Sequence, residues 1–451
     1  MDVRDKNVLI VGLGKSGLSA ARLLTSCGAI ISVQDSKKRE ELNEVPAGRA
    51  YLGGELPPED AKYDLIVLSP GVPPALPWIE AYKNRGIELT GELELAYRMG
   101  RGKYIGITGT NGKTTTTTLV GEIFRRSGLP TLVEGNIGTP LCEAAERSED
   151  ETCHIVEVSS FQLETIKEFK PLVSAILNIT PDHLNRHGSM EGYIAAKARV
   201  FENQGAGDYI VYNADDPESA RLMERAATKA VLVPFSRKKE LPLGAFTREG
   251  RITVKNEAGE EVPLCLAKEL KIPGAHNLEN ALAAAAICYF SGISPEVISA
   301  ELREFPGVEH RIEPCGEING VRFFNDSKGT NPDASIKAIE AMSGPTVIIA
   351  GGYDKGSEFD EFIEAFGDKV KYAVLLGTTA EKIKKTAGKH GFGGIFIEKD
   401  MASCVRKAFE LSEPGYSVLL SPACASWDMY PSYEVRGRDF KEEVRKLKNE
   451  G

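Results

Sequence analysis

The segment YIGITGTNGKTTTTTLVGEIF, residues 104–124, decides the fold of this chain. Its apolar start is typical of a buried strand, its middle is a turn rich in glycine, and its end has the pattern of a helix. Such a turn directs backbone N–H groups and the helix dipole to one point, where a polyphosphate can bind. The spacing departs from the standard P-loop because position 107 is Ile. We nevertheless predict a polyphosphate-binding loop.

Two side chains at the start of the predicted helix have complementary chemistry. Lys113 is placed to meet β- and γ-phosphate oxygens, and the adjacent Thr114 hydroxyl is suited to a magnesium ion. The alternative is a helix start rich in threonine that binds no ligand.

A second glycine pattern lies near the N-terminus, in VLIVGLGKSGLSAARLL, residues 8–24. Gly12, Gly14 and Gly17 have the G-x-G-x-x-G spacing between a predicted strand and a predicted helix, and Asp35 ends the next strand. The pattern suits a nicotinamide dinucleotide. A tight turn without a ligand is equally compatible, and these residues alone leave both interpretations open.

Apolar runs alternate with helical patterns through the rest of the chain, as in DLIVLSPGV, HIVEVSS, SAILNIT, PTVIIAGG, YAVLLG and SVLLSPA. This alternation predicts an α/β protein with parallel sheets. We expect three domains: a Rossmann-like domain over residues 1–93, a central P-loop domain over 94–305, and a C-terminal Rossmann-like domain over 306–451. The stretch from about 235 to 266 is predicted to be rich in strands.

Composition narrows the classes of partner. The 451 residues include 55 Lys and Arg against 65 Asp and Glu, a net charge of −10, without a dense basic cluster. We therefore expect no nucleic-acid partner. No apolar run is long enough to span a membrane, and no secretory signal pattern opens the sequence, so we expect a cytoplasmic protein without membrane insertion. The eight scattered cysteines are expected to be buried reduced thiols.

Further candidate residues follow the P-loop. Glu157 interrupts an apolar strand, and a buried carboxylate is costly unless it is paired or bound to a metal, so it is a candidate magnesium ligand. A satisfied buried acid is the alternative. Asp182, His183 and Lys197 follow, but their spacing alone favours a structural histidine and a solvated lysine.

Taken together, several motifs resemble the bacterial Mur ligases. They are TGTNGKTT, EVSSFQLE, NITPDHLNRH with YIAAKARVF, GAHNLENALAA, HRIE, FNDSKGTNPDA, and SPACASWDMY with YEVRG, in this order over essentially the whole chain. Within the family the chain is most similar to members that add D-glutamate. The resemblance implies ATP-dependent amide formation through an acyl phosphate, joining D-glutamate to UDP-N-acetylmuramoyl-L-alanine in peptidoglycan precursor synthesis. It also implies that the N-terminal glycine turn binds a nucleotide-sugar diphosphate and that no nicotinamide is used.

The resemblance implies a role for each group of residues. ATP would be bound by Gly109, Thr110, Asn111, Gly112, Lys113, Thr114, Thr115, Asn280, His310, Arg311 and Asp326. The UDP substrate would be bound by Gly14, Lys15, Ser16, Gly17, Asp35, Ser36, Lys37, Ser69, Pro70, Gly71, Asn136, Ser159 and Gln162. D-Glutamate would be bound by Lys328, Thr330, Lys355, Ser426 and Tyr433. Without the family, Asn280 is better explained as a surface amide and Asp326 as a strand-end cap. Lys355 is equally well explained as a solvated side chain.

The catalytic residues implied by the resemblance are Lys113, Glu157, His183 and Lys197. Thr114 and Glu157 would hold one Mg²⁺ ion, and His183 with Lys197 a second, Lys197 after carbamylation by carbon dioxide. A carbamate replaces a repelling ammonium with an oxygen ligand. We expect a monomer.

Three other classes of protein share part of these patterns. A folate polyglutamylating ligase has the P-loop and the chemistry but lacks a preceding nucleotide-sugar domain. A dehydrogenase gives no reason for the second phosphate-binding turn. A non-catalytic nucleotide-binding regulator need not retain Glu157, His183 and Lys197 together.

Overall fold

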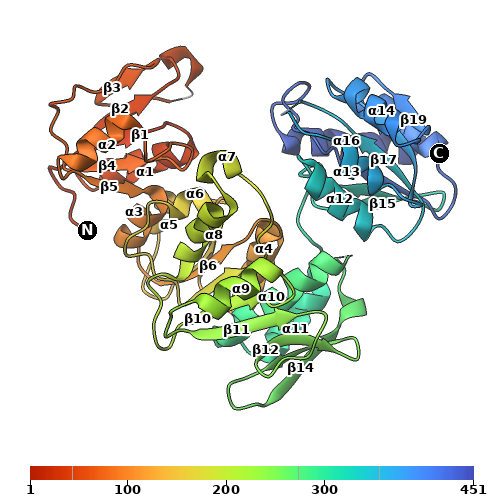
Figure 1. The fold of residues 1–451 in the computed structure, drawn as a ribbon, viewed down its shortest axis with the longest axis horizontal. Helices are drawn as coiled ribbons and strands as arrows, with labels where there is room; N and C mark the ends of the chain where they lie inside the picture. The colour runs from red at the N-terminus through yellow and green to blue at the C-terminus, as the bar shows by residue number, and fades with distance from the viewer. Residues whose placement is uncertain (43, 273, 355, 451) are drawn as a thin grey trace. The chain divides into compact units, whose positions relative to one another are not determined.

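Parallel strands alternate with helices along the chain, and this confirms the predicted α/β class (Figure 1). The structure is a computed structural model that describes residues 1–42, 44–272, 274–354 and 356–450. Over the described residues the strands form three sheets, and the chain forms two compact units. One unit comprises Met1–Glu269 and Glu279–Glu304, and the other comprises Leu270–Leu278 and Phe305–Gly451.

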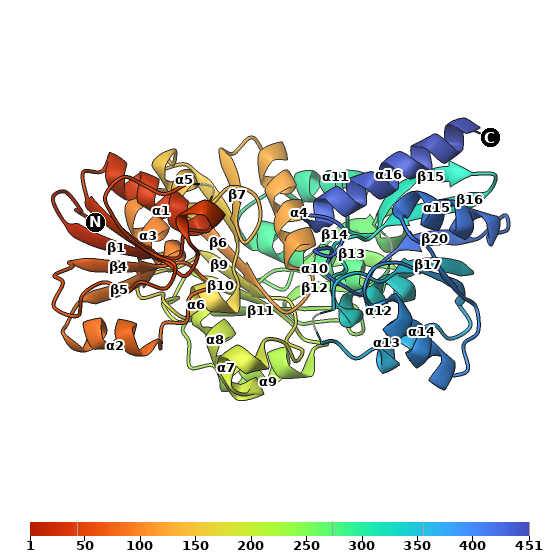
Figure 2. The same cartoon turned by 90° about the horizontal axis from the view of Figure 1, so that it is seen from above.

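The N-terminal sheet has the strand order β3-β2-β1-β4-β5 with parallel neighbours, the order expected of a Rossmann-like half. Helices α1 and α3 cover one face and α2 the other (Figure 2). The elements are β1 (Asn7–Val11), α1 (Lys15–Ser26), β2 (Ile30–Asp35), β3 (Arg49–Leu52), β4 (Leu65–Leu68), α2 (Pro77–Asn84), β5 (Glu88–Gly91) and α3 (Glu92–Met99).

The central sheet has the order β14-β13-β12-β11-β10-β9-β6-β8-β7. Its first strands are β6 (Lys103–Thr108), β7 (Thr131–Gly135), β8 (Cys153–Glu157), β9 (Val173–Ile176), β10 (Tyr209–Asn213) and β11 (Val231–Ser236). The stretch predicted to be rich in strands adds β12 (Gly244–Arg248), β13 (Arg251–Lys255) and β14 (Glu261–Leu266), which extend one edge of the sheet.

Helices on both faces of the central sheet complete this region. Those of the central region are α4 (Lys113–Arg126), α5 (Leu141–Glu146), α6 (Ser160–Leu163), α7 (Leu184–His187), α8 (Met190–Ala198), α9 (Pro217–Arg225), α10 (Ala275–Phe290) and α11 (Pro295–Glu304). Helix α5 also packs against α1 and α3, so the N-terminal and central sheets share apolar contacts within one unit. The domain boundary expected at 93/94 falls within α3, and both expected boundaries stay predictions.

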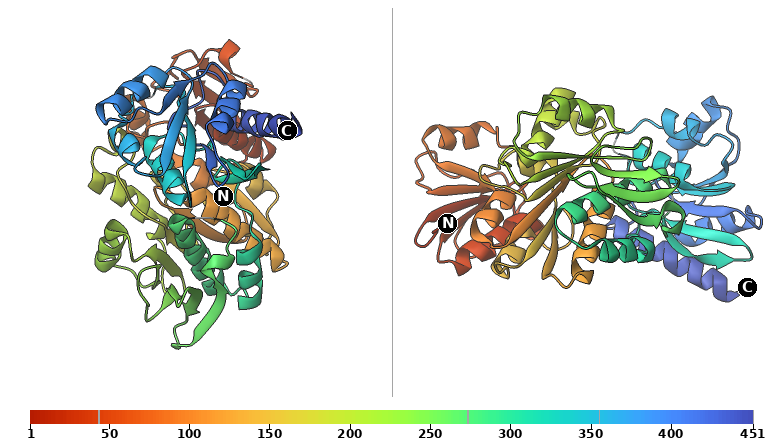
Figure 3. Two further views of the ribbon diagram at one scale, coloured as in Figure 1. Left: turned by 90° about the vertical axis from the view of Figure 1, so that its right-hand side faces the viewer. Right: turned by 90° about the horizontal axis from the view of Figure 1, so that it is seen from below.

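The C-terminal sheet has the order β15-β16-β20-β17-β18-β19, in which only the β15–β16 pair is antiparallel among the described pairings. Helices α12, α13 and α14 cover one face, and α15 with the long terminal helix α16 covers the other (Figures 2 and 3). The elements are β15 (Glu313–Ile318), β16 (Val321–Asn325), α12 (Pro332–Ala341), β17 (Thr346–Ala350), α13 (Asp360–Glu364), β18 (Val370–Leu375), α14 (Ala380–Lys389), β19 (Ile395–Ile397), α15 (Met401–Glu410), β20 (Ser417–Leu420) and α16 (Tyr433–Glu450).

Two further sequence expectations can be compared with the structure. Within the described ranges, no helix has the length and apolar character needed to cross a bilayer. All eight cysteines lie in these ranges and are free thiols, as expected. The expectation that all are buried was wrong for Cys27, which is exposed at the end of α1, and for Cys315 in β15, which is only half-buried.

Candidate active site

The P-loop connects β6 to α4, as the sequence predicts. Gly112 caps the helix with a positive φ of 82°, a conformation that favours glycine, and a Cβ there would meet Asn280 Oδ1 at 2.3 Å. The Lys113 ammonium donates to the carbonyl oxygens of Gly109 and Thr110, each at 2.8 Å. The lysine therefore lies folded over the loop, and Asn280 lies beside it.

A second lysine reaches the same loop. Lys197 lies on α8, and its Nζ donates to Gly109 O at 2.8 Å and lies 4.5 Å from the centre of the Tyr193 ring. The residue is only 1% exposed. Burial, and secondly the charge of Lys113, hold the pKa of the Lys197 ammonium well below its usual value. The prediction from spacing alone that Lys197 is solvated is therefore wrong, because the side chain is buried. Lys113 and Lys197 both donate to the carbonyl oxygen of Gly109.

Glu157 ends β8 at the edge of the sheet where β6 enters the P-loop, because Ile107 and Glu157 are partners in neighbouring parallel strands. The residue is 2% exposed, and its Oε1 accepts from Asn136 Nδ2 at 2.9 Å. In the described residues Oε2 is buried without a hydrogen-bond partner. A buried carboxylate oxygen with no donor fits a cation ligand.

The segment after β9 holds the P-loop in place. Asn178 exchanges two hydrogen bonds with the backbone of Asn111, at 2.8 and 3.1 Å. Thr110 Oγ1 donates to Thr180 O at 3.1 Å and lies 3.2 Å from the Tyr193 hydroxyl. The loop conformation is thus fixed by polar contacts from outside the loop.

His183 caps α7 with a φ of 52°, and its half-exposed side chain lies 3.5 Å from Asp182. Its ring lies 4.9 Å from that of Phe161, which also contacts His187. The His187 ring in turn contacts Tyr193, the residue that lies over Lys197. An aromatic cluster therefore connects His183 to the surroundings of Lys197.

The N-terminal glycine turn lies at the point where the strand order reverses, between β1 and β4. A Cβ at Gly17 would lie 1.8 Å from Gly12 O, so glycine is required for the close approach of α1. Ser69 Oγ donates to Gly12 O at 2.8 Å and connects the turn after β4 to the glycine turn. Gly14 and Lys15 are exposed at the start of α1, and Ser16 is half-buried.

Other predicted substrate-binding residues have local structural contacts. The Asp35 carboxylate accepts from the backbone N–H groups of Leu13 at 2.6 Å and Lys37 at 2.8 Å. Ser159 and Gln162 form a reciprocal capping box at the start of α6. Ser36, Lys37 and Gly71 are exposed, whereas Pro70 is half-buried.

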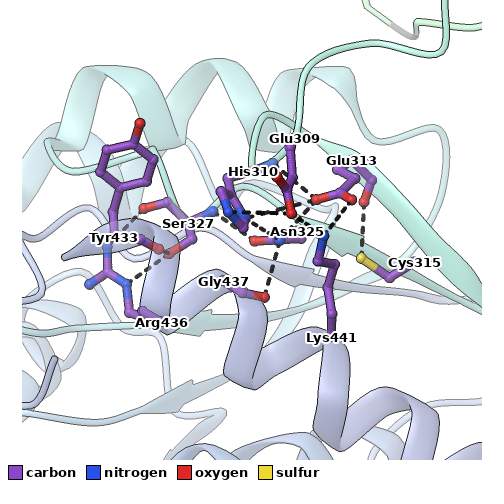
Figure 4. A network of polar contacts seen from close by, with 10 residues as sticks. All are labelled: Glu309, His310, Glu313, Cys315, Asn325, Ser327, Tyr433, Arg436, Gly437 and Lys441. Atoms are coloured by element: carbon purple, nitrogen blue, oxygen red, sulfur yellow. Dashed lines mark hydrogen bonds and ion pairs between the residues drawn. The ribbon is translucent and has the colours of Figure 1, made fainter. Parts of the chain in front are cut away.

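In the second unit, His310 lies at the centre of a polar network (Figure 4). Asn325 Nδ2 donates to His310 Nδ1 at 2.9 Å, and its Oδ1 accepts from Ser327 N at 3.1 Å. His310 is 3% exposed, and burial lowers the pKa of its imidazole. Since Nδ1 accepts, the proton of the neutral ring lies on Nε2. Lys441 pairs with Glu309 at 2.5 Å and with Glu313 at 2.9 Å beside it.

Asp326 follows β16 and is 6% exposed. Ser421 Oγ, which follows β20, donates to Asp326 Oδ2 at 2.7 Å, and burial raises the pKa of the carboxyl to about 7. Lys328 lies 5.5 Å from the Tyr433 ring, and this ring lies 6.0 Å from that of His310. The structure thus brings Asp326, Lys328, Tyr433 and His310 to one edge of the C-terminal sheet.

A buried arginine organises the loops at this edge. The Arg436 guanidinium donates to Ser327 O at 2.8 Å and to Cys424 O at 3.1 Å, and it also reaches Ala425 O and Ser327 Oγ. It thereby joins the loop of Lys328 and Thr330 to the loop of Ser426, which is itself 2% exposed. Lys355, also predicted to bind D-glutamate, lies outside the described residues.

The sequence interpretation missed several of these residues. Asn325 contacts His310, Tyr193 contacts Thr110, and the backbone N–H of His187 donates to His183 O. Arg436 contacts Ser327 and Ala425, the neighbours of Lys328 and Ser426. All four belong to the motifs that carry the family resemblance, so their place in those motifs was the available signal. Nothing in the sequence shows that Arg436 is buried among carbonyl oxygens or that Asn325 orients His310.

The fold and the site define a class. The central region combines a strand, P-loop and helix with a buried acid and a buried lysine, and Rossmann-like regions precede and follow it in the sequence. These features define a multidomain P-loop nucleotide-binding protein. Family models match three parts of the chain: the Mur ligase MurD-like N-terminal domain over residues 6–91, the Mur ligase middle domain over 107–288, and the Mur ligase glutamate ligase domain over 310–424. The chain belongs to the Mur ligase family.

Curated relatives match from end to end. UDP-N-acetylmuramoylalanine–D-glutamate ligase of Caldanaerobacter subterraneus is 49% identical over 99% of this chain and 100% of its own length. The protein of the same name from Clostridioides difficile is 48% identical with the same coverage. Among solved structures, UDP-N-acetylmuramate-alanine ligase of Thermotoga maritima has a TM-score of 0.62 at 18% identity, covering 98% of this chain and 100% of its own. The MurF ligase of Thermotoga maritima in complex with ADP has a TM-score of 0.58 at 17% identity, covering 99% and 96%. These two likenesses concern the fold.

Proposed function

We propose that this chain is an ATP-dependent ligase that joins D-glutamate to UDP-N-acetylmuramoyl-L-alanine. The observation that carries the proposal is the 49% identity, over 99% of the chain, to a relative named for this reaction. The ADP complex of a relative with the same fold supports ATP as the nucleotide. A cytoplasmic location, as a step of peptidoglycan precursor synthesis, and a monomeric state belong to the same proposal.

The chemistry consists of two displacements. The terminal alanine carboxylate of the nucleotide sugar attacks the γ-phosphorus of ATP, which releases ADP and forms an acyl phosphate. The amine of D-glutamate then attacks the acyl carbon, and the tetrahedral intermediate expels phosphate as the amide forms and the amine loses a proton. The protein must bring anions together and neutralise their charge. We assign this task to Lys113, His310 and Arg311.

Magnesium belongs to the proposal because the donor set fits it. The unpartnered Oε2 of Glu157 and the Thr114 hydroxyl would hold one ion, and His183 with carbamylated Lys197 would hold a second. When bound, the two ions would offset the negative charge of the phosphates and the attacking carboxylate.

Carbamylation of Lys197 is supported by its surroundings. Carbon dioxide reacts with the neutral amine, forming an N–C bond and releasing a proton. Burial and Lys113 both favour the neutral form of Lys197. A carbamate would also remove the repulsion between two ammonium groups that now share Gly109 O.

The remaining roles follow the grouping made from the sequence. We assign adenine to Asn280, the ATP ribose to Asp326, and the phosphates to the backbone of the P-loop. The UDP substrate is assigned to the glycine turn, to 35–37, to the turn 69–71 and to Asn136, Ser159 and Gln162. D-Glutamate is assigned to Lys328, Thr330, Lys355, Ser426 and Tyr433. The proximity of Lys328 to Tyr433 supports the last group.

The experiment that tests this function is phosphate release from ATP with UDP-N-acetylmuramoyl-L-alanine and a panel of amines. The panel comprises D-glutamate, L-glutamate, glycine, L-lysine, meso-diaminopimelate and no amine, with the product mass measured. We expect release that depends on D-glutamate and a product heavier by one glutamyl residue. Release that depends on another amine would move the chain to a different ligase of the family. No amine-dependent release would contradict the ligase.

A further inference from the structure

Arg186 connects the N-terminal region of the first unit to its central region, and the proposed function assigns it no role. Its Nη2 donates to Val72 O at 3.1 Å, and its Nη1 lies 3.5 Å from Gly71 O. On its other side, Nε and Nη2 donate to the two carboxylate oxygens of Glu164, at 3.2 and 2.7 Å. One guanidinium thus contacts the turn after β4 and the end of α6 together.

The turn that Arg186 holds is the one assigned to the nucleotide sugar. Val72 N donates to Ser69 O at 2.9 Å, which closes the turn, and Ser69 Oγ donates to Gly12 O in the glycine turn. Pro70 and Val72 line a small pocket with Phe161 and Gln162. The backbone carbonyls that Arg186 binds therefore belong to a segment whose position fixes the proposed substrate site.

Arg186 is also built into the helix that presents His183. Its backbone N–H donates to His183 O at 2.9 Å, and His183 caps the same helix in a left-handed conformation. Helix α7 is a single turn, and isolated helices of this length are unstable in water. The contacts of the Arg186 side chain therefore restrain where His183 lies, together with the ring contact between His183 and Phe161.

The contacts require arginine rather than any cation. The side chain is 16% exposed, its partner Glu164 is 15% exposed, and the guanidinium carbon lies 4.9 Å from the centre of the Phe161 ring. A planar group can stack on the ring and donate in two directions at once. A lysine ammonium is a point charge and cannot reproduce this fork.

We propose that Arg186 is a positioning residue that couples the nucleotide-sugar turn 69–72 to the helix carrying His183. The inference rests on the proposed function, because that function assigns a substrate to the turn and a metal to His183. Occupation of the nucleotide-sugar site then favours the placement of His183 needed for the reaction, and loss of Arg186 weakens both.

Arg186→Ala and Arg186→Lys test the coupling in the full chain. Titration calorimetry with UDP-N-acetylmuramoyl-L-alanine, without ATP, measures the dissociation constant, and steady-state kinetics measure kcat and the KM for ATP. We expect the dissociation constant to rise about tenfold and kcat at saturation to fall about tenfold in both variants. The KM for ATP should change less than twofold, because the P-loop makes none of these contacts.

Arg199→Ala is the matched control. Arg199 also donates to two backbone carbonyls, Leu163 O at 2.7 Å and Ile166 O at 2.6 Å, and also pairs with a carboxylate, that of Glu202. Within the part of the chain that the structure describes, its side chain forms hydrogen bonds and ion pairs only with Leu163, Ile166 and Glu202, and not with the turn 69–72. A purely structural role for Arg186 predicts that Arg199→Ala and Arg186→Ala change affinity alike, whereas coupling predicts normal affinity in Arg199→Ala.

The outcomes separate this inference from the proposed function. A wild-type protein that fails to bind the nucleotide sugar overturns the function itself. A wild-type protein that binds it, together with a folded Arg186 variant that binds within twofold, overturns only the coupling. Weaker binding with an unchanged kcat also overturns it, because His183 would then be placed independently. If Arg186→Ala does not fold, Arg186→Lys decides, since it keeps the charge and the aliphatic stem.

Discussion

At the scale of single residues, the unusual feature is one carbonyl oxygen, that of Gly109, bound by two lysine side chains. Burial, and secondly repulsion between the two ammonium groups, lowers the pKa of Lys197. Binding of an anion beside the two lysines, or loss of the charge on Lys197, would reduce the repulsion between their ammonium groups. This arrangement supports our proposals that the loop binds a polyphosphate and that Lys197 is carbamylated.

Lys197→Ala should lose at least a hundredfold in kcat, because the carbamate that would hold a metal is gone. Wild-type activity should also fall reversibly when carbon dioxide and bicarbonate are removed. Lys103→Ala, an exposed lysine at the start of β6, is the control and should keep wild-type turnover. Near-normal turnover in Lys197→Ala would remove this residue from the mechanism.

Asp326 predicts a pH dependence of stability. Its folded pKa of about 7 lies above the usual aspartate value of 3.8, so the folded protein keeps a proton that the unfolded chain has released. This contribution to stability is complete below about pH 4 and is lost as the pH rises through 7. Between pH 5 and 7, wild type should lose about 2 kcal/mol relative to Asp326→Asn, whose amide does not titrate. Parallel stability curves from denaturant titrations would contradict the assignment.

At the scale of elements, α16 is packed directly against His310. A Cβ at Gly437 would lie 2.3 Å from His310 Nδ1 and 3.1 Å from Asn325 Nδ2. Glycine is therefore required here for a close approach, although it lowers helix propensity. The network in Figure 4 depends on this approach.

Gly437→Ala should displace His310, destabilise the second unit by about 1–3 kcal/mol and raise the KM for ATP. Gly388→Ala is the matched control in the same unit, because its position in α14 has no atom within 4 Å of an added Cβ. Calorimetry should show Gly388→Ala to be neutral or slightly stabilised. A Gly437→Ala protein with wild-type stability and an unchanged KM would show that His310 has room to move.

Element by element, the local patterns explain what the sequence could predict. The glycine turns and the buried strands follow from short-range rules, and for this reason the P-loop between β6 and α4 was predictable. The burial of Lys197 was not, because a helical lysine is normally solvated and only the fold places it beneath the P-loop. The same holds for Arg186 and Arg436, whose partners include backbone carbonyl groups that carry no sequence signal.

At the scale of the whole molecule, three parallel-sheet regions each place their functional residues at the carboxyl ends of neighbouring strands. The glycine turn and Ser69 follow β1 and β4, the P-loop and Glu157 follow β6 and β8, and Asp326 and Ser421 follow β16 and β20. This is the general location of ligand sites in open α/β sheets. The sequence alone supports the fold class, whereas the substrates depend on the relatives.

The most direct test of the central claim is a transfer of ¹⁸O from the substrate carboxylate to phosphate. UDP-N-acetylmuramoyl-L-alanine labelled with ¹⁸O in its terminal carboxylate is incubated with the wild-type protein, ATP and D-glutamate, and the phosphate is analysed by mass spectrometry. The acyl phosphate mechanism predicts one ¹⁸O atom in each phosphate released, together with formation of the glutamyl product. Phosphate without ¹⁸O would show that ATP is hydrolysed by water and would contradict the proposed ligase chemistry.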